Sequence, residues 1–298
     1  MSNDAHNQVT RRRLLQSAGM AAAAATGAFA QPAITAAQVV ERIKRNLADE
    51  GLAWGPSAFD GFHLGDPDTV VLGIATTFQP TLSVLQRAAA AGRNLVVCHE
   101  STYWDGFDPV ESLKNDSVCL AKIRFGEQHK MAVWRIHDHW HRRKPDPIFT
   151  ALARKLDWSA YYDVDSKPRR YTIPEMTLED VARHIQRRLG TQNVVVVGDR
   201  SLRVTTIGDC AHILSSVLPA LRTCDAALVG ETPQHDTFEY VRDAMSLGLR
   251  KGVLMISHEG LEEWGMEACA EWLAPLIPEL PVQWIPTGDP FQVPAIRI

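Results

Sequence analysis

Three short apolar segments of this chain end in a histidine with an acidic residue beside or near it. They are Asn94–Glu100, Ala132–His141 and Gly252–Glu262. A short apolar run bounded by turn residues is typical of a buried strand in an α/β sheet. Ligands of such sheets bind at the carboxyl ends of the strands. The three segments therefore predict a metal site assembled from distant parts of the sequence.

In the first segment, His99 and Glu100 leave the end of the strand together. On a continuing strand the two side chains would point to opposite faces. If the chain turns after Cys98, both can reach one cavity and act as ligands. A core histidine beside a surface glutamate is the alternative, and these residues alone leave both open.

The second segment carries the densest cluster, the run His137–His141, whose order is His, Asp, His, Trp, His. On an extended chain, the three histidines would share one face, and Asp138 and Trp140 the other. Neutral imidazoles suit zinc, iron, nickel, copper or manganese rather than calcium or magnesium, which prefer oxygen. The alternative is a histidine-rich surface edge, although Trp140 requires cover.

The third segment places His258 four residues before Glu262. A helix beginning near Glu259 would put both side chains on one face, able to chelate one ion or bridge two. Pairs with this spacing are common on helix surfaces. The pair therefore indicates a metal site only together with the other two segments.

Alternating strand and helix patterns can position these three segments. Residues 37–50 and 82–91 are typical of helices, residues 70–75 of a strand, and the strand before His99 completes a β-α-β unit. A second cycle begins near Tyr171. The polar stretch from residue 157 to 170 separates the two cycles. We expect an α/β fold with an N-terminal lobe (31–156) and a C-terminal lobe (157–298).

The second cycle predicts several further elements. They are helices at 178–189, 211–221, 235–247 and 265–276, and strands at 193–198, 203–207, 226–229, 253–256 and 282–285.

Composition and motifs exclude several classes of protein. The chain has 298 residues, 45% of them hydrophobic and 22% charged, which is typical of a soluble globular protein. No stretch predicts a membrane span in the mature chain. There is no G-x-S-x-G, P-loop or G-x-G-x-x-G motif. The five cysteines lack CxxC spacing, so we expect buried thiols.

The first 30 residues have the order of a twin-arginine export signal. Arg11-Arg12-Arg13 is followed by two leucines, a mild alanine-rich segment and the cleavage pattern Ala28-Phe29-Ala30. Removing residues 1–30 leaves 28 basic and 34 acidic groups, a formal charge of 28 − 34 = −6. We expect the twin-arginine machinery to export the chain to the periplasm or beyond. A mildly acidic protein is a poor candidate for nucleic-acid binding.

Several motifs, in order, resemble the Nif-three-like dinuclear metal-centre family, often labelled GTP cyclohydrolase 1 type 2. The resemblance covers nearly all of the mature chain. It rests on Gly65-Asp-Pro-Asp68, Val71-Leu-Gly-Ile74, Thr81 to Ala88, Gly92-Arg-Asn-Leu95, His99 to Trp104, Cys224 to Glu231 with His235, Ser257 to Glu262, and Thr287-Gly-Asp-Pro-Phe291.

This resemblance implies a two-lobed α/β subunit, often assembled as a hexameric ring, with two divalent metals between the lobes. The usual ligands are a His-His pair, the aspartate of an H-T-x-x-D stretch, and the His and Glu of a G-H-x-x-x-E stretch. Carried over by position, the ligands are His99, Glu100, His141, His258 and Glu262. The resemblance leaves the metals (zinc, manganese, iron or nickel), the substrate and the ring size open.

Two ligand positions depart from the family pattern in compensating ways. Glu100 stands where the second histidine is usual, and His141 stands where the aspartate is usual. The formal charge of the ligand set is therefore unchanged. Because a neutral imidazole cannot bridge two metals, we expect Glu100, or Asp138 in a shifted register, to be the bridge. Ser101 replaces the usual proline.

These observations predict a metal-dependent hydrolase acting through a metal-bound hydroxide. Glu259, His137 or His235 would serve as the catalytic proton shuttle or hold a ligand in place. An exported protein would meet little GTP, so we do not expect GTP itself to be the substrate. The alternative is a non-catalytic metal carrier, store or scaffold, since the same ligands serve either role.

Overall fold

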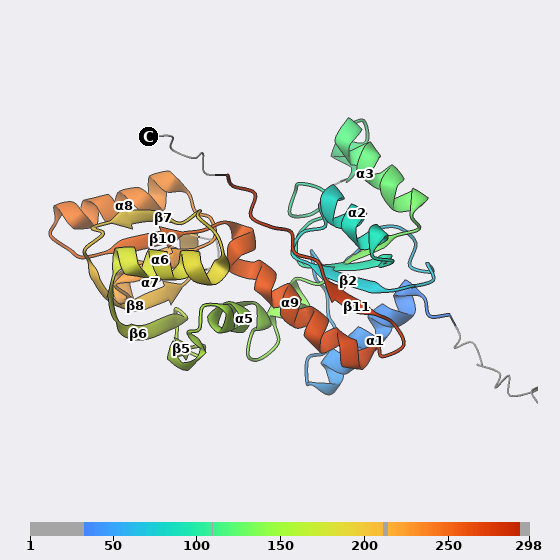
Figure 1. Ribbon diagram of the computed structural model, residues 1–298, viewed down its shortest axis with the longest axis horizontal. Helices are drawn as coiled ribbons and strands as arrows, with labels where there is room; N and C mark the ends of the chain where they lie inside the picture. The colour runs from blue at the N-terminus through green and yellow to red at the C-terminus, as the bar shows by residue number, and fades with distance from the viewer. Residues whose placement is uncertain (1–32, 109, 211–213, 293–298) are drawn as a thin grey trace, which may run out of the picture. The chain divides into compact units, whose positions relative to one another are not determined.

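The computed structural model describes residues 33–108, 110–210 and 214–292, which form a mixed α/β fold with two sheets (Figure 1). The predicted export signal, residues 1–30, lies outside the described residues. Within those ranges, no helix has the length and apolar character needed to cross a membrane.

The first sheet places the ends of two ligand-bearing strands side by side. Its order is β1 (Gly61–Leu64), β4 (Ala132–Arg135), β3 (Leu95–Cys98), β2 (Ile74–Thr77) and β11 (Val282–Trp284). Strands β3 and β4 are parallel, with Cys98 opposite Arg135. His99 and the run from His137 therefore leave the sheet at the same edge. The helices of this part of the chain are α1 (Ala36–Asp49), α2 (Leu82–Ala90) and α3 (Ser117–Gln128), with a 3-10 turn, η1, at Val110–Leu113.

The second sheet has a parallel centre flanked by antiparallel strands. Its order is β5 (Tyr162–Asp163), β6 (Arg170–Thr177), β8 (Arg203–Asp209), β9 (Ala226–Val229), β10 (Gly252–Met255) and β7 (Val195–Gly198). Strands β8, β9 and β10 are parallel, whereas β6 and β7 run antiparallel to their neighbours. The helices of this part are α6 (Leu178–Leu189), α7 (Leu214–Thr223) and α8 (Gln234–Ser246).

The long helix α9 (His258–Leu276) packs into both hydrophobic cores. Leu261 and Trp264 lie in the core of the second sheet, whereas Met266, Cys269 and Leu273 lie in the core of the first. The helix begins well before the expected start at residue 265, because the side chain of Ser257 accepts a hydrogen bond from Gly260 N at 3.0 Å and caps it.

After α9 the chain returns to the first sheet. Strand β11, expected in the C-terminal lobe (157–298), pairs in parallel with β2, which belongs to the sheet of the other lobe. The last strand therefore crosses back, since α9 ends against the first core. Earlier in the chain, the helix α5 (Pro147–Lys155) and the 3-10 turn η2 (Ser159–Tyr161) lie between the last residues of β4 and the start of β5.

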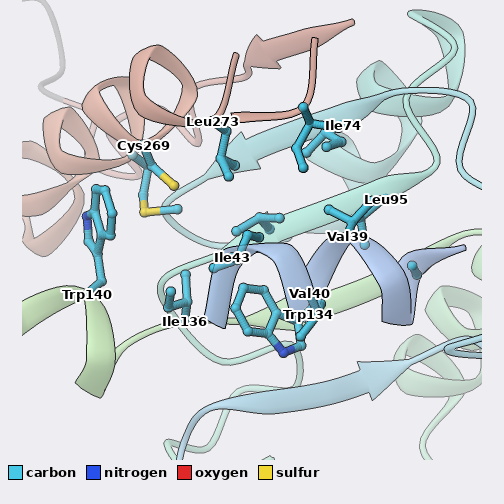
Figure 2. Close-up of a cluster of buried hydrophobic side chains, with 14 of the residues drawn as sticks. Val39, Val40, Ile43, Ile74, Leu95, Trp134, Ile136, Trp140, Cys269 and Leu273 are labelled. Carbon is cyan, nitrogen blue, oxygen red and sulfur yellow. The ribbon is translucent and has the colours of Figure 1, made fainter. Parts of the chain in front are cut away.

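The first core anchors the chain next to the histidine run. Figure 2 shows side chains of α1, such as Ile43, beside Trp134 of β4, with Trp140 near Cys269 of α9. Trp140 is fully buried, and its indole N–H donates to the carbonyl of Gly265 at 3.2 Å. Burial of an aromatic ring with a satisfied N–H is strongly stabilising. Trp140 thus fixes the histidine run against α9.

Candidate metal centre

The histidine run is a helical turn rather than an extended segment. Residues Asp138–His141 form the short helix α4, with His137 at its N-cap. In a helix, residues four apart share a face. His137 and His141 therefore point the same way and His139 does not, so the expectation that all three histidines share one face is wrong.

His139 has a structural role instead. Its side chain is completely buried, and its ring stacks on Trp54 with centroids 3.7 Å apart. The ring Nε2 accepts a hydrogen bond from Gly55 N at 3.0 Å, while Nδ1 contacts Asp60 Oδ2 at 2.5 Å. Both ring nitrogens are thus occupied, and His139 is not available as a ligand.

Two overlapping groups of side chains could hold metal ions. In the first, His99, His137 and His141 have ligand atoms within 4.8 Å of one another. In the second, the same holds for His99, Glu100 and Glu262. His99 belongs to both groups, so they form one centre. Each of its five residues is among those that the sequence singled out.

The pair on α9 joins this centre. Glu262 Oε2 lies 3.2 Å from His99 Nε2 and 3.2 Å from His258 Nε2. Glu262 therefore links the first sheet's ligands to His258, as the spacing of four residues on one helix face predicts. His99 and Glu262 are buried, while the side chains of Glu100, His137, His141 and His258 remain 16–24% exposed. One side of the centre is thus accessible.

Carboxylates orient two of the histidines. His137 Nδ1 lies 3.1 Å from Asp138 Oδ1, and His141 Nδ1 lies 2.9 Å from Asp146 Oδ2. Such contacts fix the ring and leave Nε2 for a metal. Asp138 also accepts a hydrogen bond from Ser57 Oγ at 2.9 Å and belongs to neither ligand group. The helical turn thus places Asp138 behind His137, not in the predicted bridging position.

Glu100 is held by Arg135, a residue that sequence reasoning missed. Arg135 Nη2 donates to Glu100 Oε2 at 2.9 Å, and its Nε donates to the His99 carbonyl at 2.9 Å. The other oxygen, Glu100 Oε1, lies 3.8 Å from His137 Nε2. Arg135 is the last residue of β4 and only 2% exposed. An arginine at the end of an apolar strand is the sequence signal that could have identified this residue.

The ionisation of the centre suits metal ligands. Burial and the nearby rings of His99 and His141 lower the pKa of His137 to about 4, so this imidazole is neutral at pH 7. Burial alone would raise the pKa of Glu262, but His258 and His99 outweigh it and hold that pKa well below its usual range. Similarly, burial would raise the pKa of Glu100, yet His99 and Arg135 lower it. Both carboxylates are therefore charged.

Nearby carboxylates raise the pKa of two histidines. Burial would lower the pKa of His258, but Glu262 raises it to about 9. For His141, Asp146 outweighs burial and raises the pKa. The His258 ring is therefore cationic at pH 7 when it faces only carboxylates. Because a metal binds only the neutral ring, binding must release protons.

The residues present fit a divalent transition metal. His99 Nδ1 is buried and has no hydrogen-bond partner among the described residues. A buried polar atom without a partner is costly and calls for an explanation such as a missing ion. Imidazoles and carboxylates together suit zinc, manganese, iron or nickel better than calcium or magnesium.

The three expected proton shuttles lie in different surroundings. His137 lies within the ligand group. Glu259 stands in the first turn of α9, where burial raises the pKa of its carboxyl. His235, on α8, has a side chain 84% exposed and lies 3.5 Å from Asp236. The structure does not bring His235 to the centre.

All five cysteines, which lie within the described residues, are buried free thiols, as expected.

Solved structures with the same fold show little sequence identity to this chain. The Staphylococcus aureus hypothetical protein SA1388 aligns with a TM-score of 0.67 at 19% identity, over 88% of this chain and 99% of that one. A Bacillus cereus protein related to NIF3 aligns with a TM-score of 0.67 at 13% identity, over 87% and 99%. Reduced HcgD from Methanocaldococcus jannaschii aligns with a TM-score of 0.60 at 18% identity, over 84% and 97%.

The chain matches no curated protein. A family match, however, covers most of its length, from residue 45 to residue 289. This range includes both sheets and every residue of the candidate metal centre. The chain belongs to the family described as Duf34/NIF3 (NGG1p interacting factor 3).

Proposed function

We propose that this protein binds two divalent transition-metal ions and uses them for hydrolysis. The observation that carries the proposal is the sharing of His99 between two ligand groups, with Glu262 between His99 and His258. One group is rich in imidazole and the other in carboxylate. Two ions at this centre would lower the pKa of a coordinated water and polarise a carbonyl, ring carbon or phosphoryl group.

Glu262 is the carboxylate best placed to bridge the two groups. Its Oε2 is equally close to His99 and His258, and the pKa of its carboxyl lies well below the usual range. Glu100, the bridge expected from sequence, has one oxygen engaged by Arg135. Arg135 holds that carboxylate beside His99 and partly offsets its charge. Glu262 would therefore hold metal together with His99 and His258, and Glu100 would add a second carboxylate ligand.

Glu259 is the group best suited to hold a proton at the centre. It follows His258 directly, and burial raises the pKa of its carboxyl, with Asp289 and Glu231 adding to the effect. A carboxyl with a raised pKa holds its proton more tightly, and this favours a role as a general acid. The partly exposed ligands leave one side through which a small substrate can approach.

The proposal is tested by assaying the metal-loaded protein against panels of nucleotides, phosphoesters and amides. We expect turnover of at least one class, and its loss in His99→Ala, which removes the residue common to both ligand groups. His129→Ala is the matched control, because His129 is an exposed histidine at the end of α3. Absence of turnover with every panel, together with transfer of bound metal to an acceptor, would instead support a metal carrier or store.

We also propose export by the twin-arginine route and assembly into a homo-oligomer. The first rests on the paired arginines and the cleavage pattern at Ala28–Ala30, and the second on the resemblance to ring-forming relatives. Mass spectrometry of the mature protein should find Gln31 at the N-terminus. Light scattering should give a mass several times that of one chain. An intact N-terminus or a monomer would contradict the respective proposal.

A further inference from the structure

A buried carboxylate outside the ligand set organises the backbone that carries two of the ligands. Asp60 Oδ1 accepts hydrogen bonds from His137 N at 2.5 Å and Asp138 N at 3.0 Å. Asp60 Oδ2 accepts from His139 N at 3.0 Å and contacts His139 Nδ1 at 2.5 Å. The side chains of Asp60 and His139 are both 0% exposed. One carboxylate thus binds three successive amides and one ring.

These amides need a partner because they begin a helix. The first N–H groups of a helix have no intrahelical acceptor, and a side chain normally caps them. His137, the N-cap residue of α4, makes no such bond. Asp60 supplies it from a position 77 residues earlier in the chain, just before β1. Its negative charge also suits a helix N-terminus.

The choice between a helical and an extended run decides which histidines can meet. An extended run would put His137, His139 and His141 on one face, whereas the helical turn selects His137 and His141. An extended run would separate residues 137 and 141 by about 13 Å, whereas the helical turn brings both rings to His99, with centroids 4.6 and 4.9 Å from its ring. The bonds of Asp60 are made to the helical turn.

We propose that Asp60 is a positioning residue of the metal centre. Asp60 stabilises the helical turn that points His137 and His141 towards His99. It contacts the backbone of this turn and none of the ligand side chains. This inference rests on the proposed metal binding, and it adds a residue that controls metal affinity from behind the ligands.

Asp60→Asn is the sharpest variant because the tautomer of His139 is fixed. Since Nε2 of that ring accepts from Gly55 N, Nδ1 must carry the proton that it donates to Asp60. An asparagine at position 60 has one acceptor oxygen and one NH2 group. Whichever way it is turned, the NH2 group faces an N–H, either of the backbone or of the ring. The substitution keeps the shape of the side chain and breaks the network.

Asp225→Asn is the matched control. The Asp225 carboxylate Oδ2 also accepts four hydrogen bonds, from the amides and hydroxyls of Thr205 and Thr206 at 2.9–3.0 Å. Those partners lie on β8 in the second sheet, and Asp225 belongs to neither ligand group. Because the amide oxygen of asparagine can take the place of Oδ2 without its charge, the substitution should weaken this network and lower stability modestly, and it should not change the metal centre.

The experiment titrates Co²⁺ into wild type and both variants in competition with a chromogenic chelator, and records the visible spectrum of bound Co²⁺. We expect Asp60→Asn to weaken binding about 10–100-fold, as for other groups that orient ligands, and to alter the spectrum. Asp225→Asn should lower the unfolding temperature of the metal-free protein and leave affinity and spectrum unchanged.

Each outcome has a distinct meaning. Wild-type affinity and spectrum in Asp60→Asn would overturn the positioning role while leaving the proposed function intact. Absence of Co²⁺ binding in wild type would overturn both. If Asp60→Asn does not fold, Asp60→Ser keeps a short oxygen acceptor of the kind that caps helices. Weakened binding in that variant would support the proposal, and unchanged binding would overturn it.

Discussion

Two buried carboxylates in this protein have pKa values shifted in opposite directions, and the contrast separates the candidate metal centre from an ordinary polar core. Glu262, on α9, is 1% exposed, and Asp209, at the end of β8, is 2% exposed. Histidines surround Glu262 and hold its pKa well below the usual range. Around Asp209, burial outweighs Arg169 and two tyrosines and raises the pKa to about 6.

The difference shows that neighbours rather than burial decide which carboxylate can bind a cation. Glu262 lies between two imidazoles, His99 and His258, at 3.2 Å each. Asp209 accepts from the hydroxyl of Tyr171 at 3.1 Å, and the ring of Tyr162 stacks on that of Tyr171. A tyrosine hydroxyl keeps its proton and donates a hydrogen bond, whereas an imidazole offers a lone pair to an ion once it has released its proton. We infer that only the Glu262 cluster is built for a metal.

The largest expected effect is on metal affinity. Glu262→Gln should weaken binding by more than the about 10–100-fold typical of residues behind the ligands, because it removes a charged ligand between two histidines. Asp209→Asn makes the same chemical change at a similarly buried position and should leave affinity unchanged. Chelator competition measures both. Equal losses in the two variants would show that the clusters do not differ as we describe.

Metal should also stabilise the fold. At a free metal concentration 100 times Kd, the expected gain in the free energy of unfolding is about 2.7 kcal/mol. Chemical denaturation with and without a chelator measures it. Asp209→Asn should retain the gain and Glu262→Gln should lose it. If the chelator does not change the stability of wild type, the centre holds no metal in the folded protein.

The metal-free protein should lose stability at alkaline pH. The folded pKa of His258, about 9, exceeds its ordinary value of 6.5. The ion pair with Glu262 therefore stabilises fully below pH 6.5, and this contribution is lost as the pH rises through 9. The shift corresponds to about 3 kcal/mol. Denaturation of wild type and His258→Gln from pH 6 to 10 should show the loss in wild type alone.

Asp209 should change the stability of the protein in a different, acidic pH range. Its folded pKa, about 6, exceeds the ordinary value of 3.8, so the folded state binds the proton more tightly. Stability from this group is therefore greatest below pH 3.8 and is lost as the pH rises through 6. In Asp209→Asn this acidic component should vanish while the alkaline component from His258 remains. Loss of both components in this single variant would mean that the two clusters are coupled.

The smallest expected effect is that of Tyr171→Phe. The variant removes one buried hydrogen bond to Asp209 and should cost about 1–3 kcal/mol, since it leaves a buried acceptor with one partner fewer. Metal affinity should not change. A denaturation curve and a metal titration on the same sample check both points, and weaker metal binding would connect the tyrosine cluster to the centre.

Much of the fold follows from patterns that the sequence shows directly. The alternation of strands and helices predicts the α/β class, and the shared edge of β3 and β4 follows from two parallel strands. The spacing of His258 and Glu262 correctly predicts that their side chains lie close together, since both stand on a single helix. These features depend on local periodicity, which one sequence contains.

Other features depend on contacts between distant residues. The helical turn at His137–His141 is capped by Asp60, and nothing in the run itself shows that cap. The same turn moves Asp138 behind His137 and buries His139 against Trp54. Strand β11 pairs with β2, some 200 residues earlier in sequence. In each case contacts between distant residues, rather than the local sequence pattern, decide the structure.

The most direct test of the metal centre is anomalous X-ray diffraction from crystals of the metal-loaded protein. We predict two anomalous peaks in the cluster around His99 and Glu262, one towards His137 and His141 and the other towards Glu100 and His258. Glu262→Gln crystals should lose at least one peak. Anomalous density elsewhere in the molecule, or none at His99 and Glu262 in protein that elemental analysis shows to contain metal, would contradict the account.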